Sequence, residues 1–513
     1  MRVKAAIVIV GILGLVFLLR SPGNKVEFPE ETNLCEGLNK NHHEKLSTAL
    51  APFRKQMKNQ TGVLPLETGE SAMLARAWLS DAAERSIDVQ YFIFKKDNVG
   101  LIAFDYLVHA ADRGVKVRVL VDDFMLEFEE DEVLAMASHP NIDIKIYNPG
   151  VNLGKNFLEK IKKYATDFKG ANQRMHNKQF VVDGEVLITG GRNVEGMYFD
   201  FDHEYNFRDR DVLFIGKAAR EGQESFEQYW NNELSVNVTE LLDGELAGKE
   251  TESQFSALHN YACDPNNFWP QIREEIKNLS SFFEEIRNSD KFVWTEKATM
   301  VCDTPGKNQA QESWSGGGLT TQKLVELVSS AEHSIAMQTP YLITTEDTRK
   351  LFKNKTDAGV DIRILTNSLA STDNVEAFSG YQRDRDALLN TGVSVFEFRP
   401  DAAVRLKIAA SELQELIDHR AIFGTHAKTM VVDNRITVIS TFNLDPRSAN
   451  LNTECLAIID DQKIAKSVME GIEEEFKQEN SWQITLEWNP DGEVDLSKRV
   501  KTWTRRVIPK DVL

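Results

Sequence analysis

Two copies of one short pattern of chemically reactive residues lie 250 positions apart in the chain. Each copy reads His-x-Lys-x4-Asp and continues, after six further residues, with two small residues, one variable residue and an Asn. Its members are His176, Lys178, Asp183, Gly190, Gly191 and Asn193 in the first copy, and His426, Lys428, Asp433, Ser440, Thr441 and Asn443 in the second. One copy alone would mean little, because so short a pattern arises by chance. Two copies with an Asn at the same offset indicate a duplicated functional site.

The histidine and lysine of each copy are two positions apart, so on a β-strand their side chains point to the same side. A lysine ammonium can hold a phosphate oxygen, while a neutral imidazole with an ordinary pKa near ~6.5 can act as nucleophile or proton carrier. The amides of Asn193 and Asn443 can donate hydrogen bonds to the same oxygens. The pattern therefore predicts chemistry at phosphorus, with four catalytic side chains: His176, Lys178, His426 and Lys428.

Each Asp of the pattern lies where its copy must reverse direction. Short apolar runs at 179–182 and 186–189 flank Asp183-Gly184, and the runs at 429–432 and 436–439 flank Asp433-Asn434. Each copy is therefore expected to form a β-hairpin, for which Asp, Gly and Asn are favoured turn residues. Asp183 and Asp433 are either catalytic members of the pattern or structural turn residues, and the sequence leaves both alternatives open.

The repetition extends well beyond the reactive residues. The run SIDVQ at 86–90 matches SIAMQ at 334–338, and GVKVRVL at 114–120 matches GVDIRIL at 359–365. In each unit, helical periodicity alternates with short β-branched runs, which predicts α/β domains with a largely parallel sheet and helices on both faces. Neither half carries a second nucleophile or a metal-ligand cluster, so a complete site needs both His-Lys pairs facing each other.

The paired pattern resembles the phospholipase D superfamily, whose mark is two His-x-Lys-x4-Asp motifs, and the resemblance covers about 63–477. The segments TFNLDPRS at 441–448, NTE at 452–454 and QTPY at 338–341 are similar, more narrowly, to bacterial cardiolipin synthases of type C. The resemblance implies two tandem phospholipase D-like α/β domains related by a pseudo-two-fold axis, with one site between them. The sequence contains no metal-ligand spacing, and we expect no cofactor and no metal.

The same resemblance implies a phosphatidyltransferase that works through a phosphohistidine. His176 attacks the phosphodiester of a phospholipid, and His426 protonates the leaving alcohol and then deprotonates the acceptor. Giving the nucleophile's part to His176 follows the family, because the sequence itself is symmetric. The expected substrates are phosphatidylglycerol and, as a further donor, phosphatidylethanolamine. If water is the acceptor, the enzyme is instead a phospholipase D. Both copies are intact, which disfavours a catalytically dead scaffold.

Each imidazole needs a carboxylate that holds it in one tautomer. In the second half Glu454 is the natural candidate, since it opens an expected strand at 454–459. Aligning that strand with 211–215 makes Asp211 the counterpart in the first half, with Asp209 and Glu204 as alternatives. The second copy has Ser440 and Thr441 in place of two glycines. Their hydroxyls could donate to phosphate, and we expect altered geometry there without loss of activity.

We expect five segments along the chain. They are a membrane anchor or signal at 1–25, a linker at 26–62, a first phospholipase D-like domain at 63–235, a bridge at 236–310 and a second domain at 311–513. Four cysteines are present, of which Cys263 and Cys302 flank the bridge and can pair in an oxidising compartment, while Cys455 lies in an expected strand.

The first twenty residues indicate a membrane location. Ala5 to Leu19 form an uncharged run between Lys4 and Arg20, which favours an uncleaved anchor over a cleaved signal because no Ala-x-Ala site follows. The balance of basic residues favours catalytic domains outside the cytoplasm, on the bacterial inner membrane.

The charge of the whole chain argues against a nuclease of the same superfamily. The formal net charge is −19 and the pI is near 5.1, whereas proteins that bind long polyanions usually carry a basic surface. One basic stretch, from Lys155 to Arg174, is interpreted either as a lip that touches anionic lipid or as an ordinary surface helix. The expected partners are phospholipids and a membrane, with no nucleic acid, and the expected state is a monomer.

Overall fold

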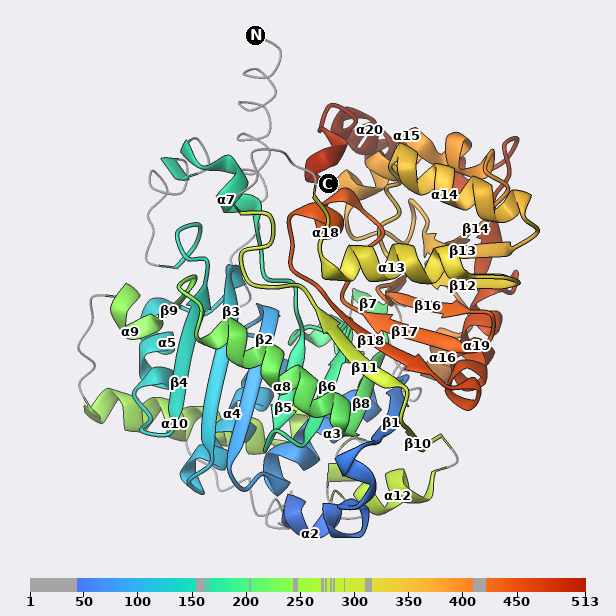
Figure 1. Cartoon of the computed structure of the whole chain (residues 1–513). Coiled ribbons are helices and arrows are strands. Elements are labelled where there is room, and N and C mark those ends of the chain that lie inside the picture. Colours follow the sequence, from blue (N-terminus) through green and yellow to red (C-terminus); the bar gives the residue numbers. More distant parts are fainter. Residues whose placement is uncertain are drawn as a thin grey trace.

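Two α/β halves, each built on one large sheet, face each other in a computed structural model of the whole chain (Figure 1). The structure describes residues 44–513 except 154–161, 164–165, 203, 243–247, 269–271, 273–274, 277–278, 280–281, 290, 310–315 and 409–420. The expected N-terminal anchor, and much of the basic stretch that begins at Lys155, lie outside these residues. Among the described helices, none is both long and apolar enough to cross a bilayer.

The first half is built on a nine-stranded sheet in the order β10-β1-β8-β6-β5-β2-β3-β4-β9. Strands β2, β3 and β4 run parallel to one another, while the other neighbours pair antiparallel. The strands are β1 (Thr61–Leu66), β2 (Ser86–Phe94), β3 (Lys116–Leu126), β4 (Ile142–Tyr147), β5 (Gln179–Val182), β6 (Val186–Gly190), β8 (Asp211–Gly216), β9 (Ser235–Asn237) and β10 (Val293–Thr295).

The second half repeats eight of these strands in the same spatial order, β11-β18-β17-β16-β12-β13-β14-β19. Strands β12, β13 and β14 are again parallel, and β16 and β17 again form the hairpin that follows the His-Lys pair. The strands are β11 (Ala298–Cys302), β12 (Ser334–Gln338), β13 (Asp361–Asn367), β14 (Ser394–Phe398), β16 (Thr429–Val432), β17 (Ile436–Ser440), β18 (Cys455–Asp460) and β19 (Ser481–Gln483). The duplication expected from the sequence is therefore a duplication of topology.

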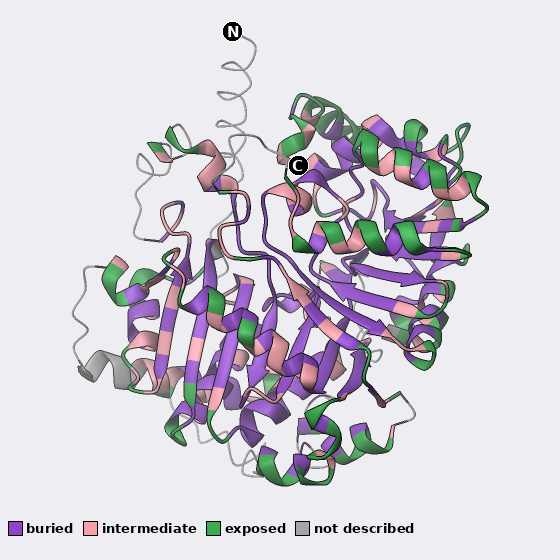
Figure 2. Cartoon of the chain, in the orientation of Figure 1, coloured by how far each residue is buried: buried purple, intermediate pink, exposed green. Residues whose placement is uncertain are grey.

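Helices cover both faces of each sheet, and strand alternation decides which core each residue joins (Figure 2). In the first hairpin, Phe180 and Ile188 pack with α3 and α4, whereas Val181 and Leu187 join a cluster that contains residues of α8 and of the second half. The helices of the first half are α2 (Leu46–Leu50), α3 (Gly69–Ala82), α4 (Asn98–Asp112), α5 (Glu130–Ala137), α7 (Phe168–Asn172), α8 (Lys217–Trp230), α9 (Val238–Leu241), α10 (Gly248–Cys263) and α12 (Phe282–Asn288).

The interface between the halves has an apolar core of its own. Val181 and Phe214 from the first sheet share one buried cluster with Val431 and Ile439 from the second, so burial of these strand faces fixes how the halves meet. The helices of the second half are α13 (Leu319–Ser330), α14 (Glu346–Asp357), α15 (Val375–Leu389), α16 (Arg405–Ile408), α18 (Pro446–Asn450), α19 (Gln462–Phe476) and α20 (Leu496–Arg505).

The expected bridge at 236–310 belongs to both sheets. Its strand β10 pairs with β1 of the first sheet, and its strand β11 pairs with β18 of the second. Its helix α10 packs on α4 of the first half. A short parallel pair, β7 (Tyr205–Arg208) with β15 (Ile422–Thr425), adds a further link between the halves.

The cysteine pairing differs from the expectation. Cys302 is bonded to Cys455, and not to Cys263. The reason is strand register, because β11 runs along β18 with Cys302 directly opposite Cys455 and their Cα atoms 4.2 Å apart. The disulfide therefore joins the segment that links the halves to the strand that follows Glu454.

Candidate active site

Both His-Lys pairs lie at the interface of the halves, each just before the first strand of its hairpin. The backbone N–H of His176 donates to the carbonyl of Thr453 over 3.0 Å, and that of His426 donates to the carbonyl of Arg208 over 2.7 Å. The segment that contains His176 therefore runs beside the residues just before β18 of the second half. The segment that contains His426 runs beside the residues just before β8 of the first half. The two pairs are thereby brought to one place although they are 250 positions apart.

His176 is buried, with 6% of its surface exposed, and its ring is held from two sides. Its Nδ1 lies 2.9 Å from Oε2 of Glu454, and the ring of Phe92 packs edge-on with a centroid distance of 5.1 Å. The ammonium of Lys178 is buried as well and donates to the carbonyl oxygen of His176 over 2.8 Å. Nδ1 therefore carries the proton toward Glu454, which leaves the Nε2 lone pair available.

His426 is held in the same manner by different residues. Its Nδ1 lies 2.6 Å from Oδ2 of Asp209, and the rings of Tyr198 and Phe207 pack against it. The ammonium of Lys428 donates to the carbonyl of His426 over 2.7 Å and lies 3.0 Å from Nε2. Each imidazole thus has one carboxylate, one lysine and aromatic neighbours.

The two carboxylates are exchanged between the halves. Glu454 belongs to the second half and orients the histidine of the first, while Asp209 belongs to the first half and orients the histidine of the second. Neither carboxylate therefore orients the histidine of its own half. The carboxylates cross because the backbone contacts made by Thr453 and Arg208 already place each of them beside the opposite histidine.

The expectation that Asp211 is the counterpart of Glu454 is wrong. Strand register shows the error, since Gly190 lies opposite Asp211 and the equivalent Ser440 lies opposite Leu456. Glu454 is two residues before Leu456, so its true counterpart is two residues before Asp211, which is Asp209. A shift of two keeps the same strand face, and sequence periodicity therefore could not tell these carboxylates apart.

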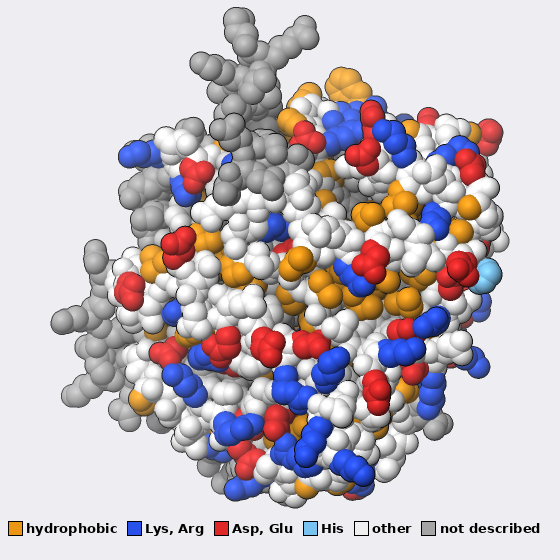
Figure 3. All heavy atoms as spheres, viewed as in Figure 1, with side chains coloured by type: hydrophobic (Ala, Val, Ile, Leu, Met, Phe, Trp, Pro, Cys, Tyr) orange, Lys and Arg blue, Asp and Glu red, His pale blue; other side chains and the backbone are white. Residues whose placement is uncertain are grey.

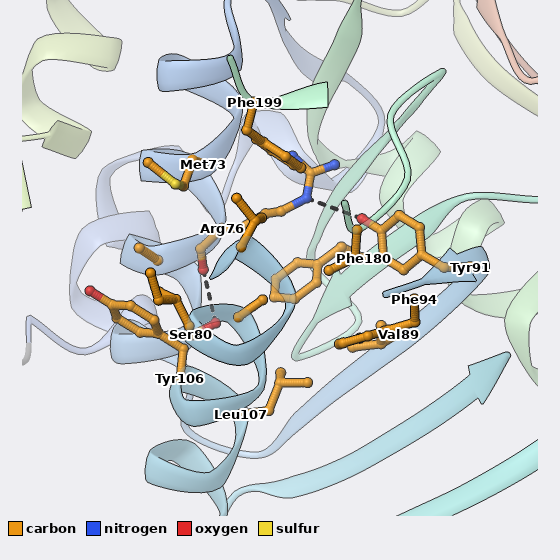
Figure 4. Close-up of a pocket in the computed structure, with 15 residues that line it drawn as sticks. Met73, Arg76, Ser80, Val89, Tyr91, Phe94, Tyr106, Leu107, Phe180 and Phe199 are labelled. Carbon is orange, nitrogen blue, oxygen red and sulfur yellow. Dashed lines mark hydrogen bonds between the residues drawn. The ribbon is translucent and has the colours of Figure 1, made fainter. Parts of the chain in front are cut away.

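Asp211 instead pairs with two arginines below the site. Its Oδ2 accepts a hydrogen bond from Arg76 over 2.9 Å, and Oδ1 accepts from the backbone N–H of Arg192 over 3.3 Å. Arg76 also donates to the hydroxyl of Tyr91 and lines an apolar cavity of about 60 Å³ between α3, α4 and the sheet (Figure 4). Neither catalytic histidine lines this cavity, so it is separate from the site.

Burial dominates the electrostatics of the site. It lowers the pKa of His176 well below the ordinary value, and the ammonium groups of Lys178 and Lys428 lower it further. Burial and the same two lysines act on His426 in the same direction. Burial also lowers the pKa of Lys178 to about 7 and that of Lys428 to about 8, although carboxylates oppose it. Both imidazoles are therefore neutral in the resting site.

The carboxyl groups shift in the opposite direction for the same reason. Burial raises the pKa of Glu454 to about 7, although the charge of Lys178 acts against this. The pKa of Asp209 is raised by burial too, with Lys428 opposing. Such displaced pKa values concentrated in one buried place are typical of catalytic sites.

The structure places Asp183 and Asp433 at the hairpin turns, with φ of 53° and 52°. Oδ1 of Asp183 accepts from the N–H groups of Arg85 and Ser86, and Oδ2 accepts from that of Glu84. Asp433 holds the N–H groups of residues 332–334 in the same way. These contacts favour the structural alternative over the catalytic one, because both carboxylates are occupied by backbone donors.

The two Asn residues are used differently. Asn193 accepts a hydrogen bond from the N–H of Ile93 and donates to the hydroxyl of Tyr198 over 2.9 Å, so it supports the ring that packs on His426. Asn443 is buried, and its Oδ1 has no hydrogen-bond partner among the described residues. The side-chain oxygen of Asn443 is thus an acceptor that meets no donor among the described residues.

The hydroxyls of Ser440 and Thr441 are not directed at a phosphate position, which corrects the expectation. Ser440 donates to the carbonyl of Lys428 over 3.1 Å, and Thr441 donates to Oε2 of Glu454. In the first half Gly191 leaves room for Asp209, whose Oδ1 would lie 2.0 Å from a Cβ at that position. The difference between the copies therefore serves the two carboxylates.

Sequence reasoning missed several residues that complete the site. The rings of Phe92 and Tyr198 have no local signal, since aromatic residues are common in cores. The guanidinium of Arg447 contributes to the low pKa of His176, and its presence in the TFNLDPRS segment was a usable hint. Arg208 and Arg210, on either side of Asp209, form a buried ion network with Glu67 and Glu475 that joins the halves.

One group among the described residues could hold a metal ion, and it lies outside the catalytic site. Asp105 and His109 on α4 approach His259 on α10, with ligand atoms within 4.8 Å of one another. Nδ1 of His259 is 3.1 Å from Oδ1 of Asp105 and 2.5 Å from Nε2 of His109. These groups already satisfy one another by hydrogen bonds, so the cluster by itself assigns no metal.

Comparison with known proteins identifies relatives of this chain by amino-acid sequence. The family model described as "Cardiolipin synthase, PLD-like domain" matches residues 79–230 and 324–479. Cardiolipin synthase C of Escherichia coli strain K12 is 32% identical, over 88% of this chain and 92% of that protein. An uncharacterized protein of Helicobacter pylori strain ATCC 700392 / 26695 is 33% identical, over 84% and 82%.

A solved structure shows the same fold. Phosphatidylserine synthase of Haemophilus influenzae Rd KW20 superposes with a TM-score of 0.56 at 12% identity, covering 88% of this chain and 95% of the other. The tandem α/β architecture expected from the duplication is therefore confirmed.

Proposed function

The chain belongs to the cardiolipin synthase family of the phospholipase D superfamily, and we propose that it makes cardiolipin by moving a phosphatidyl group through a covalent intermediate on His176. The observation that carries this proposal is the meeting of two buried His-Lys pairs in one site. Each imidazole is oriented through Nδ1, by Glu454 and by Asp209 respectively. Such a site holds one nucleophile and one proton carrier on opposite sides of a single phosphorus.

In the first step, Nε2 of His176 attacks the phosphorus of phosphatidylglycerol. A P–N bond forms, the P–O bond to the headgroup glycerol breaks, and His426 gives its Nε2 proton to the departing oxygen. The ammonium groups of Lys178 and Lys428 neutralise the phosphoryl oxygens, with Asn443 as a further polar contact. Glu454 stabilises the positive charge that develops on the His176 ring.

In the second step, the headgroup hydroxyl of another phosphatidylglycerol gives its proton to Nε2 of His426 and attacks the phosphorus. The P–N bond breaks, and His176 is restored. The products are cardiolipin and free glycerol. If phosphatidylethanolamine is the donor, ethanolamine leaves in the first step and the second step is unchanged.

His426 must carry a proton when the donor binds, although its pKa is low in the resting site. The bound phosphodiester brings one negative charge among the two ammonium groups. That charge offsets the field of Lys178 and Lys428 and raises the pKa of His426. Proton uptake by His426 is therefore coupled to donor binding. His176 is neutral before the donor binds, because its pKa is low in the resting site.

We propose that the active unit is a monomer held at a membrane by its N-terminal segment, with the catalytic halves outside the cytoplasm. The presence of both His-Lys pairs in one chain supports the proposal of a monomer. The outward orientation is supported by the Cys302–Cys455 disulfide, because disulfides persist in oxidising compartments and are rare in the cytosol. We further propose that the chain is divided into two domains, 63–235 and 311–513, joined by the segment 236–310.

The reaction is tested with the full-length protein in detergent micelles that contain phosphatidylglycerol, with and without phosphatidylethanolamine. Mass spectrometry is expected to show cardiolipin with glycerol, or with ethanolamine when that lipid is the donor. Phosphatidic acid as the main product would instead show a phospholipase D. Cleavage of oligonucleotides without any lipid turnover would overturn the proposal.

The nucleophile is tested by trapping with phosphatidylglycerol labelled at phosphorus. The His426→Asn variant is expected to retain label on the protein, because its intermediate forms slowly and is not resolved, whereas His176→Asn is expected to retain none. His333→Asn, at an exposed position before β12, is the matched control and should turn over normally. Label on His176→Asn but not on His426→Asn would reverse the assignment.

A further inference from the structure

The C-terminal helix α20 is turned with its polar side inward. Thr502 is 1% exposed, and the ammonium of Lys498 donates to the carbonyl oxygens of Ala370 and Thr372. Arg505 pairs with Glu376 at the start of α15, over 2.9 Å. The helix is therefore fixed to the second half by polar contacts, in contrast to the usual amphipathic helix, which buries its apolar stripe.

The outward side of this helix is apolar. Leu496 is 70% exposed, Trp503 is 66% exposed, and Val500 and Val507 are at least half exposed. Their spacing of four, three and four residues places them along one stripe, with Val507 just beyond the helix end. Leu486 and Trp488, in the chain that leads to α20, are exposed as well. A contiguous apolar surface of this kind on a folded protein marks a binding face.

Basic side chains surround the stripe. The segment 496–513 contains one acidic side chain, Asp511, against six basic ones, although the whole chain has a net charge of −19. Hydrophobic and basic side chains are seen together at the end of the molecule where α20 lies (Figures 1 and 3). The basic residues are Lys498, Arg499, Lys501, Arg505, Arg506 and Lys510. Lys498, Arg505 and Lys510 are bound to partners in the second half, and Arg499, Lys501 and Arg506 are exposed.

We propose that α20 is an interfacial anchor that lies in the plane of an anionic phospholipid bilayer, with Leu496, Val500, Trp503 and Val507 in the acyl region. An exposed Trp on an apolar stripe flanked by Lys and Arg is the pattern of a helix that lies on a membrane. The basic residues match the negative surface of such a bilayer. A protein groove would match the stripe but gives no reason for the basic excess.

The tail that follows α20 connects this face to the rim of the catalytic site. Arg447 donates from its backbone N–H to the carbonyl of Leu513 and from its guanidinium to the carbonyl of Val512. The same guanidinium donates to the side chain of Asn172 on α7, and its charge acts on His176. Helices α7, α18 and α20 lie at one end of the molecule (Figure 1). Docking of α20 thus holds the rim of the site at the lipid surface.

The docking is tested by placing one spin label on the stripe of the full-length protein. No free cysteine occurs among the described residues, so Trp503→Cys gives a single labelled position there. In vesicles of phosphatidylglycerol and phosphatidylcholine, the label is expected to be reached by oxygen and protected from a water-soluble nickel complex. Thr48→Cys, on the exposed side of α2 at the opposite end of the molecule, is the control and should remain open to nickel.

A functional arm uses the double variant Leu496→Ser/Trp503→Ser, whose replaced side chains are mostly exposed, and thermal denaturation checks that the variant is folded. Its turnover on anionic vesicles is expected to fall about 10-fold or more, while turnover of a short-chain, monomeric phosphatidylglycerol stays unchanged. Loss on both substrates to the same extent would overturn the docking role. This arm rests on the proposed reaction, whereas the label arm does not.

The remaining outcomes are separable. A label at 503 that stays open to nickel in vesicles overturns the proposal, and so does dipolar broadening between labels in detergent, which would show a second copy of the chain on the stripe. Absence of lipid turnover in the unaltered protein, with the label still protected in vesicles, would sink the proposed reaction and leave the docking intact.

Discussion

Oε2 of Glu454 lies 2.9 Å from Nδ1 of His176, although the two residues are 278 positions apart and belong to different halves. Asp209 stands in the mirrored relationship to His426, at 2.6 Å. Neither half therefore supplies both an imidazole of the motif and the carboxylate that holds it. Orientation of His176, the proposed nucleophile, depends on the contact between the halves, and so the interface is part of the proposed site.

This exchange predicts the effect of removing each carboxylate charge. Glu454→Gln and Asp209→Asn are each expected to lower kcat about 100-fold or more, because an amide no longer holds the imidazole in the required tautomer or stabilises its positive charge. Steady-state kinetics on phosphatidylglycerol measure the loss. Asp211→Asn is the matched control and should keep kcat within about 10-fold while lowering Tm, since Asp211 pairs with arginines away from the histidines. A larger loss in Asp211→Asn than in Asp209→Asn would contradict the assignment.

The buried lysines predict a decline of activity on the alkaline side. Lys178 and Lys428, with pKa values of about 7 and about 8, must be protonated to hold the phosphate, so kcat/KM should fall as the pH rises through this range. On the acid side, kcat/KM should fall as the pH drops through about 7, because Glu454 then takes up a proton. A pH profile of kcat/KM checks both limbs.

Lys178→Arg provides the control for the alkaline limb. A guanidinium keeps its proton, so any residual activity of this variant should persist to higher pH than that of the unaltered protein. An alkaline limb at the same pH in the variant would show that Lys178 is not the group responsible.

The turn carboxylates predict a loss of stability without a loss of chemistry. Asp433→Ala leaves three backbone N–H groups without their acceptor, which is expected to cost about 2–4 kcal/mol of unfolding free energy. Thermal denaturation measures this effect, and kcat per folded molecule should change less than about 3-fold. A large drop in kcat at full folding would return Asp433 to the catalytic group. Asp183→Ala should behave alike, because its contacts are the same.

The Cys302–Cys455 bond predicts that stability depends on oxidation. It closes a loop across 153 positions, so Cys302→Ser/Cys455→Ser should lower the unfolding free energy by roughly 2–5 kcal/mol. Denaturant unfolding with and without reductant checks this. The loss of unfolding free energy caused by reductant should be smaller in the double variant, which lacks this bond. Activity should fall too, because Cys455 follows Glu454 directly and its Sγ lies 3.1 Å from the Nδ2 of Asn177.

The local features of this protein can be predicted from its amino-acid sequence. The two His-x-Lys pairs, the hairpins that carry them and the repeated strand order follow from residue spacing and alternation, which act over a few neighbouring residues. The interpretation of Asp183 and Asp433 as turn residues was available for the same reason, since turn chemistry is local.

Which residues from distant parts of the chain meet depends on the tertiary structure. Asp209 and Asp211 lie on the same strand face, and the choice between them depends on a register of two residues set by strand pairing. The exchange of Glu454 and Asp209 between the halves depends on packing across the interface. The partner of Cys302 depends on β11 joining the second sheet. No periodicity within one segment records such contacts, because they arise from the free energy of burying two surfaces against each other.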